Sequence, residues 1–326
     1  MSVEIEEKLE KIPIVNWVVR LLKTIKLPGF EGLSIYDLSE MYIRGIVQGA
    51  VSTRASSIAF SLFLALFPLL IFMVTLVPFL VSYISIENAD FDQDFLSFLE
   101  SFLPNATGEY FGEVFQQIKD QKRGGLLSSS FVISIFLMAN GVNAIFGGFE
   151  NSYHVNLTRN FFRQYLYALM VGLILSILIL VGFVVFVYFE VYVLGYLQDF
   201  AERTSGSIMD DEEVMGVQIA KFLFFIILSY LTTATLYYFG TAEGKQARFF
   251  SVGALMTTIL FILTSYLFGV YVEKFARYNE LYGALGGLLI LMVYIWLNSN
   301  ILLLGFELNA SLNWLRKNYK KDEIIE

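Results

Sequence analysis

The most restrictive feature of the sequence is a set of six long windows without a single charged residue. The windows are residues 55–86, 124–149, 164–189, 222–242, 249–272 and 281–306. A helix needs about 20 apolar residues to cross a bilayer, so each window is long enough for one crossing. Charged residues make up only 16% of the chain and hydrophobic residues 56%, which is typical of a membrane protein. We therefore expect six membrane crossings.

The windows favour helices over the strands of a membrane barrel. A barrel strand needs only about ten residues and alternates polar with apolar side chains, whereas these windows are apolar in both registers. The predicted fold class is an all-α polytopic membrane bundle of six transmembrane helices, within a domain at 45–312. An amphipathic N-terminal segment at 1–44 and a tail at 313–326 flank it. The crossings are placed at about 55–84, 126–149, 165–189, 222–240, 250–272 and 281–306.

The basic residues indicate an orientation for this bundle. With both termini in the cytoplasm, 15 of the 22 lysines and arginines fall in the inner segments and 7 in the outer segments. Short inner loops of membrane proteins carry this excess of basic residues. The first hydrophobic segment does not have the pattern of a secretory signal. The sequence therefore predicts a multi-pass protein of the bacterial inner membrane with both termini inside, in contact with membrane lipids.

Prolines and glycines modify two of the predicted helices. Pro68 and Pro78 fall in the first window, and each removes a backbone donor and favours a kink, so a tilted or broken helix is expected there. Broken helices often line transport sites, yet prolines are also common in ordinary membrane helices. Gly283 and Gly287 have the GxxxG spacing that permits two helices to approach closely. Packing within the chain is the favoured role of this pair.

The longest outer segment, at 87–123, is amphipathic. Two stripes of apolar residues at helical spacing, separated by Pro104, predict two short helices there. Their apolar faces could rest on the outer leaflet, cap the bundle as a lid, or bind a partner. Packing on the bundle is slightly favoured among these alternatives. The stripes are Phe91, Phe95, Phe98, Leu99, Phe102 and Leu103, and then Tyr110, Phe111, Val114, Phe115 and Ile118.

Polar residues in or beside the apolar windows are the strongest pointers to function. Such groups are costly in a membrane and usually face the interior of the bundle. Asparagines can simply bond between helices, so each one taken alone is better explained by structure. Glu307 could be neutralised by Arg54 near the same inner face, either as a structural ion pair or as a substrate or proton site. The candidate residues for a substrate path are Arg54, Ser61, Asn140, Asn143, Asn300, Glu307 and Asn309.

Composition excludes several classes of function. The chain has no cysteine, so disulfides, thiolate metal sites and a cysteine nucleophile are excluded. It has one histidine, His154, in a predicted short inner loop, and most familiar zinc sites need more. A net charge of −8 argues against nucleic-acid binding, which requires a concentrated basic surface. No P-loop, dinucleotide fingerprint or nucleophile elbow is present, so no cofactor and no catalytic residue are expected.

Three segments carry a resemblance to a known family. The first crossing from Arg54 through Pro68 and the last from Leu281 to Glu307 and Asn309 look like the two signature segments of the YihY/BrkB family of bacterial inner-membrane proteins. The segment from Asn140 to Arg163 resembles that family's second crossing and inner loop. The resemblance implies a six-helix inner-membrane protein. It also brings a ribonuclease BN label and a link of some members to virulence.

The residues do not support the ribonuclease label. One histidine, no evident acidic metal cluster and no basic groove leave little that could cleave RNA. Two hypotheses remain. The first is a transporter or exporter of a lipid-like or other small substrate, with a path lined by the candidate polar residues. The alternative is a non-transporting envelope scaffold that docks a periplasmic protein through residues 87–123.

Overall fold

Six helices make up most of the described structure. The computed structural model describes residues 23–24, 34, 36, 39–40, 42–43, 46, 50–81, 94, 96–98, 127–152, 155, 159–189, 211–241, 249–275 and 285–322. Each helix contains a stretch long and apolar enough to cross a membrane, which confirms the predicted all-α fold with six crossings. The helices are α4 (Val51–Val81), α7 (Leu127–Glu150), α8 (Phe161–Tyr188), α10 (Asp211–Gly240), α11 (Val252–Phe275) and α13 (Leu285–Asp322).

Two helices extend past the apolar windows that predicted them. α10 begins at Asp211 and α13 ends at Asp322, whereas the predicted crossings begin at about 222 in the one and end at about 306 in the other. The backbone hydrogen bonds of a helix do not depend on apolar side chains, so a helix can continue beyond the bilayer. No proline or glycine follows Gly305 in the sequence to stop α13. Charge marks the bilayer boundary but not the end of a helix.

Helix α4 is continuous through both of its prolines. It runs without interruption from Val51 to Val81, so the expected break at Pro68 or Pro78 is absent. Membrane helices tolerate proline because neighbouring groups and local adjustments satisfy the freed carbonyls. The helix begins after Ala50, whose φ of 47° lies in the left-handed region. The Ala50 carbonyl accepts hydrogen bonds from the backbone N–H groups of Thr53 and Arg54.

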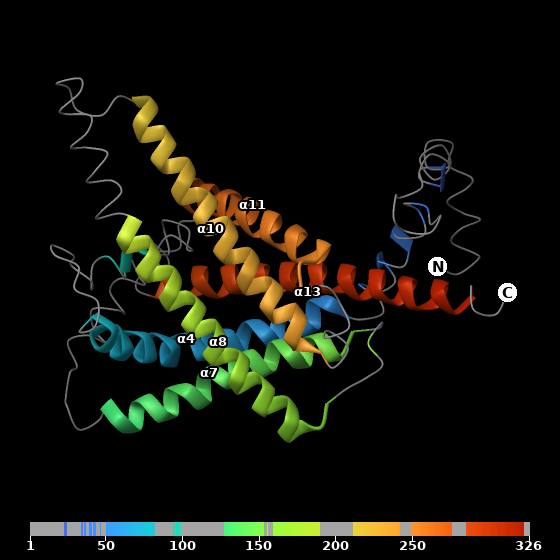
Figure 1. Ribbon diagram of the computed structural model, residues 1–326, viewed down its shortest axis with the longest axis horizontal. Helices are drawn as coiled ribbons and strands as arrows, with labels where there is room; N and C mark the ends of the chain where they lie inside the picture. Colours follow the sequence, from blue (N-terminus) through green and yellow to red (C-terminus); the bar gives the residue numbers. More distant parts are fainter. Residues whose placement is uncertain are drawn as a thin grey trace.

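The six helices close into a ring. Each helix packs on the next one along the chain, and α13 returns to pack on α4 (Figure 1). At one end of this ring α4, α8 and α11 begin and α7 and α10 end. We call this the polar end, because the buried residues Arg54, Glu150, Ser152 and Glu307 lie there. The ring brings the first and last crossings side by side, although about 250 residues separate them in the sequence.

Small residues allow the helices of this ring to approach closely. A Cβ atom on Gly148 would lie 2.6 Å from Ile58 Cδ1, and one on Gly141 would lie 2.8 Å from Ala65 Cβ, so α7 is close to α4 along two turns. Between α11 and α13, a Cβ on Gly305 would overlap Thr257 Oγ1. Lipid tails are as apolar as leucine, so close backbone contact and hydrogen bonds, rather than hydrophobic burial, hold such helices together.

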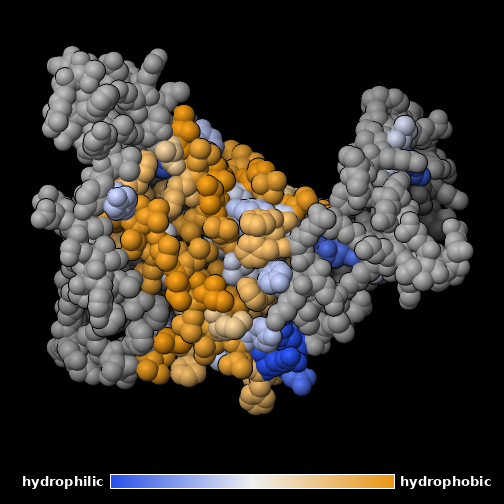
Figure 2. Space-filling model, viewed as in Figure 1, coloured by the Kyte–Doolittle hydropathy of each residue, from blue (hydrophilic) through white to orange (hydrophobic). Residues whose placement is uncertain are grey.

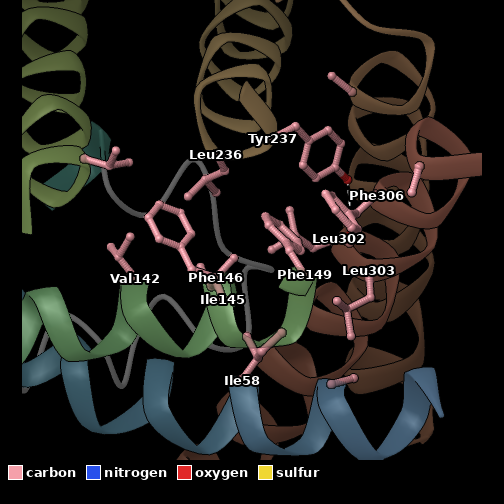
Figure 3. Packing of buried hydrophobic residues seen from close by; sticks show 14 of the residues in the cluster. Ile58, Val142, Ile145, Phe146, Phe149, Leu236, Tyr237, Leu302, Leu303 and Phe306 are labelled. Atoms are coloured by element: carbon pink, nitrogen blue, oxygen red, sulfur yellow. Dashed lines mark hydrogen bonds between the residues drawn. The ribbon is translucent and has the colours of Figure 1, made fainter. Parts of the chain in front are cut away.

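An aromatic group fills the interior of the ring near the polar end. Phe149 of α7 stacks on Phe306 of α13 with ring centroids 4.2 Å apart, and Tyr237 of α10 meets both rings edge-on (Figure 3). The Tyr237 hydroxyl donates to the Leu302 carbonyl at 2.6 Å and shares a 2.6 Å hydrogen bond with Thr257 of α11. We call Phe149, Tyr237 and Phe306 the aromatic plug, because these residues join three helices across the ring.

Packing differs between the two halves of the bundle. The main buried cluster includes the aromatic plug and lies towards the polar end. In the other half, Phe268, Val272, Ile290 and Tyr294 form a separate cluster between α11 and α13. Figure 2 shows a broad apolar surface over the helices on the visible face, as expected for a surface in contact with lipid. The larger cluster therefore joins several helices at the polar end, and the smaller one joins α11 and α13.

Candidate functional site

A buried ion pair joins the first and last crossings at the polar end. Arg54, in the first turn of α4, donates from Nη2 to Oε1 of Glu307 on α13. Arg54 Nη1 donates to the Gly148 carbonyl at 2.7 Å, near the end of α7. Glu307 is fully buried and Arg54 is 9% exposed. The structure therefore shows the predicted contact between Glu307 and Arg54. Both roles left open by the sequence, a structural ion pair and a substrate or proton site, would use this contact.

Two residues outside the crossings also lie close to Glu307. Ser152, just after α7, donates from its hydroxyl to Glu307 Oε2 at 2.8 Å. Tyr42, in the N-terminal segment, donates to the Leu304 carbonyl at 3.2 Å. Burial, together with the nearby charge of Glu307, raises the pKa of Tyr42 to about 12. The carboxylate of Glu307 is therefore held by α4 and by the residue after α7, and Tyr42 of the N-terminal segment binds the same helix at Leu304.

Two buried polar atoms of this site make no hydrogen bond with any described residue. They are Nε of Arg54 and Oγ of Ser311. Ser311 is fully buried and lies one helical turn after Glu307 on the same face of α13. A buried donor without a partner costs about 1–3 kcal/mol, so such atoms in a folded protein require an explanation.

A second arginine binds the end of α10. Arg159, in the loop before α8, donates to the carbonyls of Phe239, Gly240 and Thr241 at 2.6–3.0 Å. Its backbone N–H donates to Glu150, and its guanidinium lies 3.8 Å from the Glu150 carboxylate. A positive charge at these last carbonyls is stabilised by the negative end of the dipole of α10. Burial lowers the pKa of Arg159 from its ordinary value, and Glu150 counteracts that shift. Arg159 therefore holds the loop before α8 against the end of α10.

Asn309 caps the start of α11. Its Oδ1 accepts the backbone N–H of Gly253 at 2.8 Å, and its Nδ2 donates to Ser251 Oγ at 2.8 Å. The Ser251 hydroxyl in turn accepts the N–H of Ala254 at 3.3 Å. These bonds satisfy donors that the first turn of a helix leaves without partners. Asn309 is thus positioned at the polar end, and its observed contacts are those of a capping residue.

The other predicted path residues are not brought together with the ion pair. Ser61 is half-buried, two turns from Arg54 on the same face of α4. Asn140 is exposed on a face of α7 that it shares with the exposed Ile133 and Leu137. Asn143 is half-buried, and Asn300 donates to the carbonyl of Trp296 in its own helix at 2.8 Å. Their role as a substrate path stays a prediction.

Several predictions fall wholly or partly outside the described residues. Gly283 and His154 are not described, so the Gly283–Gly287 spacing stays untested, although Gly287 is buried. Within the outer segment 87–123, Phe98 is described and is fully buried. It contacts Phe183 and Phe186 of α8 and Phe225 of α10. This contact agrees with packing of that part of the segment on the bundle.

Sequence reasoning missed the residues that join α10, α11 and α13. Tyr237 and Thr257 are ordinary residues within apolar windows, and nothing in their spacing indicates that their hydroxyls meet. Gly253 and Gly305 have no partner glycine four residues away, because the close contact they allow is between helices. Ser152 could have been suspected, since a hydroxyl just past a crossing is at the depth of Glu307. Contacts between helices across the ring cannot be predicted from the spacing of residues within one helix.

The geometry is suited to holding or releasing a charge. Among the residues that the structure describes, no group of three or more histidines, aspartates and glutamates could hold a metal ion. The ion pair instead offers one carboxylate and one guanidinium in an interior that is otherwise largely apolar. Ionisable groups in such places commonly mark the paths of protons, ions or substrates.

The chain is similar to several bacterial proteins. It is 28% identical over 204 residues to the ribonuclease-like protein YfkH of Bacillus subtilis (strain 168). This aligned region covers 63% of this chain and 72% of that protein. It is 34% identical over 103 residues to the UPF0761 membrane protein IL2447 of Idiomarina loihiensis, covering 31% of this chain and 36% of the relative. A UPF0761 membrane protein of Vibrio cholerae is 35% identical over 111 residues, 33% of this chain and 37% of the relative. No solved structure matches the chain.

The family assignment rests on most of the chain. Residues 42–324 match the family described as virulence factor BrkB, a range that contains all six helices and the Arg54–Glu307 pair. The names of the relatives describe membrane proteins and, in one case, a likeness to ribonuclease. This chain is a multi-helix membrane protein that belongs to the virulence factor BrkB family.

Proposed function

We propose that the protein transports a lipid-like amphiphile across the membrane and that the Arg54–Glu307 pair closes the polar end of its path. The observation that carries this proposal is the position of the pair. It bridges the first and last helices of a closed ring, inside the membrane-spanning part of the bundle. A contact at that place closes the ring between α4 and α13, and its loss would allow the two helices to separate.

A buried ion pair is a poor way to gain stability alone. Removing two charges from water costs several kcal/mol per ion, and well-packed apolar side chains of similar volume are often as stabilising or better. Ionisable residues in membrane segments are rare and usually functional. The pair can also be broken by a proton or a competing ion, which an apolar contact cannot. These properties suit a gate.

The difference in packing between the two halves also favours transport. The aromatic plug and the ion pair join helices across the ring at the polar end, whereas the cluster of Phe268, Val272, Ile290 and Tyr294 lies between two neighbouring helices. Alternating access requires one end to be closed while the other end can open. These features are those expected of a state closed at the polar end.

The chemistry of the interior favours an amphiphile as substrate. The main buried cluster is apolar, whereas the buried charged residues gather at the polar end, in the Arg54–Glu307 and Glu150–Arg159 pairs. A molecule with an apolar body and a single polar head would match both features. A strongly hydrated solute would have to lose its water without polar groups to replace it, at a cost of several kcal/mol.

We place the polar end on the cytoplasmic side of a bacterial inner membrane. The supporting observation is the distribution of basic residues, of which 15 of 22 fall in the segments at this end and at the termini. Arg159 and Arg163 lie in or beside the loop between α7 and α8, at the polar end.

A lipid-exchange assay tests the proposal. The purified protein is reconstituted into phosphatidylcholine vesicles that contain fluorescent phosphatidylglycerol or fluorescent phosphatidylcholine, and dithionite quenching measures movement between leaflets. We expect faster movement than in protein-free vesicles. Glu307→Gln should lower that rate at least tenfold, because a gate that cannot close again interrupts the transport cycle. Gln218→Ala, at an exposed position of α10, is the matched control and should leave the rate unchanged.

Two results would count against the proposal. Equal rates in protein-containing and protein-free vesicles for both lipids would contradict lipid transport. A normal rate in Glu307→Gln, at normal protein content, would separate transport from the ion pair and remove its proposed role as a gate.

A further inference from the structure

The guanidinium of Arg54 is only partly used. Nη1 donates to the Gly148 carbonyl and Nη2 donates to Glu307, while Nε has no partner among the described residues. Nε and Nη2 form one edge of the guanidinium plane, the edge that binds two oxygens of a carboxylate or phosphate side by side. Glu307 does not complete this edge, because its second oxygen accepts from Ser152 instead. One donor of a two-donor edge is therefore left over.

A second unpaired group lies on the α13 side of the same site. Ser311 Oγ has no partner among the described residues, and Ser311 follows Glu307 by one turn on the same face of α13. One of these two atoms belongs to the partner of Glu307 and the other to the next turn of its helix, and a buried group without a partner costs about 1–3 kcal/mol, so an oxygen-bearing ligand would satisfy them.

Charge decides which ligand fits. With Glu307 ionised, the pair is neutral and offers an anion no net attraction. With Glu307 protonated, Arg54 is left with an uncompensated positive charge, and the N-terminal end of α4 adds the positive end of its dipole. Among the described residues, the other titratable groups at this end include Tyr42 of the N-terminal segment and the pair of Glu150, at the end of α7, with Arg159, in the loop before α8. An oxyanion and a proton therefore fit the site together.

We infer that the Nε–Nη2 edge of Arg54 binds the oxyanion headgroup of the transported amphiphile together with one proton on Glu307. The inference rests on the proposed function and adds to it the class of substrate and the coupled ion. One proton enters with one negative charge, so the loaded site has the same net charge as the empty one. Binding of the anion also weakens the contact between α4 and α13, which links loading to opening of the polar end.

Calorimetry on the purified full chain in neutral detergent tests this inference. The probe is dihexanoyl phosphatidylglycerol, a phosphodiester whose charge does not change between about pH 5 and pH 9. Its Kd should rise about tenfold per pH unit once Glu307 loses its proton in the free protein, because one proton is bound with each anion. Titrations in two buffers with different heats of ionisation should show uptake of one proton. Dihexanoyl phosphatidylcholine, with the same phosphate but no net charge, is the matched ligand and should not take up a proton.

Two substitutions distinguish this site from general adsorption. Glu307→Gln keeps the shape of the side chain without its charge, so binding should persist with no pH dependence and no proton uptake. Arg54→Lys keeps the charge but lacks the two-donor edge, and we expect at least tenfold weaker binding. Circular dichroism and gel filtration establish that both variants are folded. Dimethyl phosphate, which has no acyl chain, shows whether the site selects a lipid headgroup or any phosphodiester anion.

Specific results would overturn the inference. They are a Kd independent of pH in the wild-type protein, an unchanged pH dependence in Glu307→Gln, or unchanged affinity in Arg54→Lys. Proton-linked binding without lipid movement in vesicles would retain the site and reject the transport function. Lipid movement without proton-linked binding would retain transport and reject this inference.

Discussion

At the scale of single residues, the ion pair between Arg54 and Glu307 is the most unusual feature of the protein. Both side chains are buried, and the two residues hold three helices through one guanidinium and one carboxylate. Breaking such a pair leaves a buried charge without compensation, whereas replacing both partners by apolar groups can be neutral. We therefore expect each single substitution to lower the free energy of unfolding and the double apolar substitution to restore it.

A double-mutant cycle tests this expectation. Glu307→Ala or Arg54→Ala alone should lower the free energy of unfolding by about 3–5 kcal/mol, because each leaves the other charge unpaired. The double variant Arg54→Met with Glu307→Leu should recover most of that loss. Unfolding in mixed micelles, followed by circular dichroism, gives the values. Additive losses would show that the two side chains do not interact.

Tyr42 predicts a dependence of stability on alkaline pH. Burial and the nearby Glu307 charge raise its pKa to about 12, above its ordinary value of about 10. The folded state favours the neutral phenol, so its contribution to stability is complete below about pH 10 and is lost as the pH rises through about 12. The difference in Tm between the wild type and Tyr42→Phe should therefore shrink over this range. A constant difference would contradict the assignment.

At the scale of helices, close contact at particular glycines decides how the elements pack. Gly305 of α13 lies against Thr257 and Tyr237, and a Cβ there would overlap the Thr257 hydroxyl. Gly147 of α7 is a natural comparison, since a Cβ there would meet only Gln164 Nε2 at 3.8 Å. Both glycines lie within membrane-spanning helices, but only Gly305 is in close contact with a neighbouring helix.

Alanine substitution at these two positions should give different results. Gly305→Ala should destabilise the protein by about 1–3 kcal/mol, because α11 and α13 would have to move apart and the Tyr237–Thr257 hydrogen bond would be strained. Gly147→Ala should be neutral or slightly stabilising, since alanine is the better helix former. Thermal unfolding of both variants in one detergent provides the test. Equal effects would mean that the contact between α11 and α13 is looser than described.

The sequence predicts the elements better than the contacts between them. Long charge-free windows predicted all six helices, because the bilayer imposes length and apolarity on each crossing. They do not predict how far α10 and α13 extend past the crossings, since a helix can continue into water. Arg54 and Glu307 were paired correctly from their depth alone. The contacts of Asn309, Arg159 and Tyr237 were not predicted, because they depend on which helices become neighbours in the ring.

At the scale of the whole molecule, the ring predicts which loops lie on the same side of the membrane. Asn160 is exposed at the polar end and Gln218 is exposed near the opposite end of α10. The chain has no cysteine, so single cysteines can be introduced without removing any. In intact bacterial cells, an impermeant maleimide should label Gln218→Cys but label Asn160→Cys only after the membrane is opened. The reverse pattern would invert the proposed orientation.

The central claim is that the Arg54–Glu307 pair seals the polar end. Leu303 lies one turn before Glu307 on α13 and is fully buried in the main cluster. The direct measurement is the rate at which a small hydrophilic thiol reagent modifies Leu303→Cys in membrane vesicles, with and without the additional substitution Glu307→Gln. The exposed Asn160→Cys serves as the reference rate in both backgrounds. We predict slow modification while Glu307 is present and at least tenfold faster modification in the Glu307→Gln background. The same slow rate in both would contradict the claim.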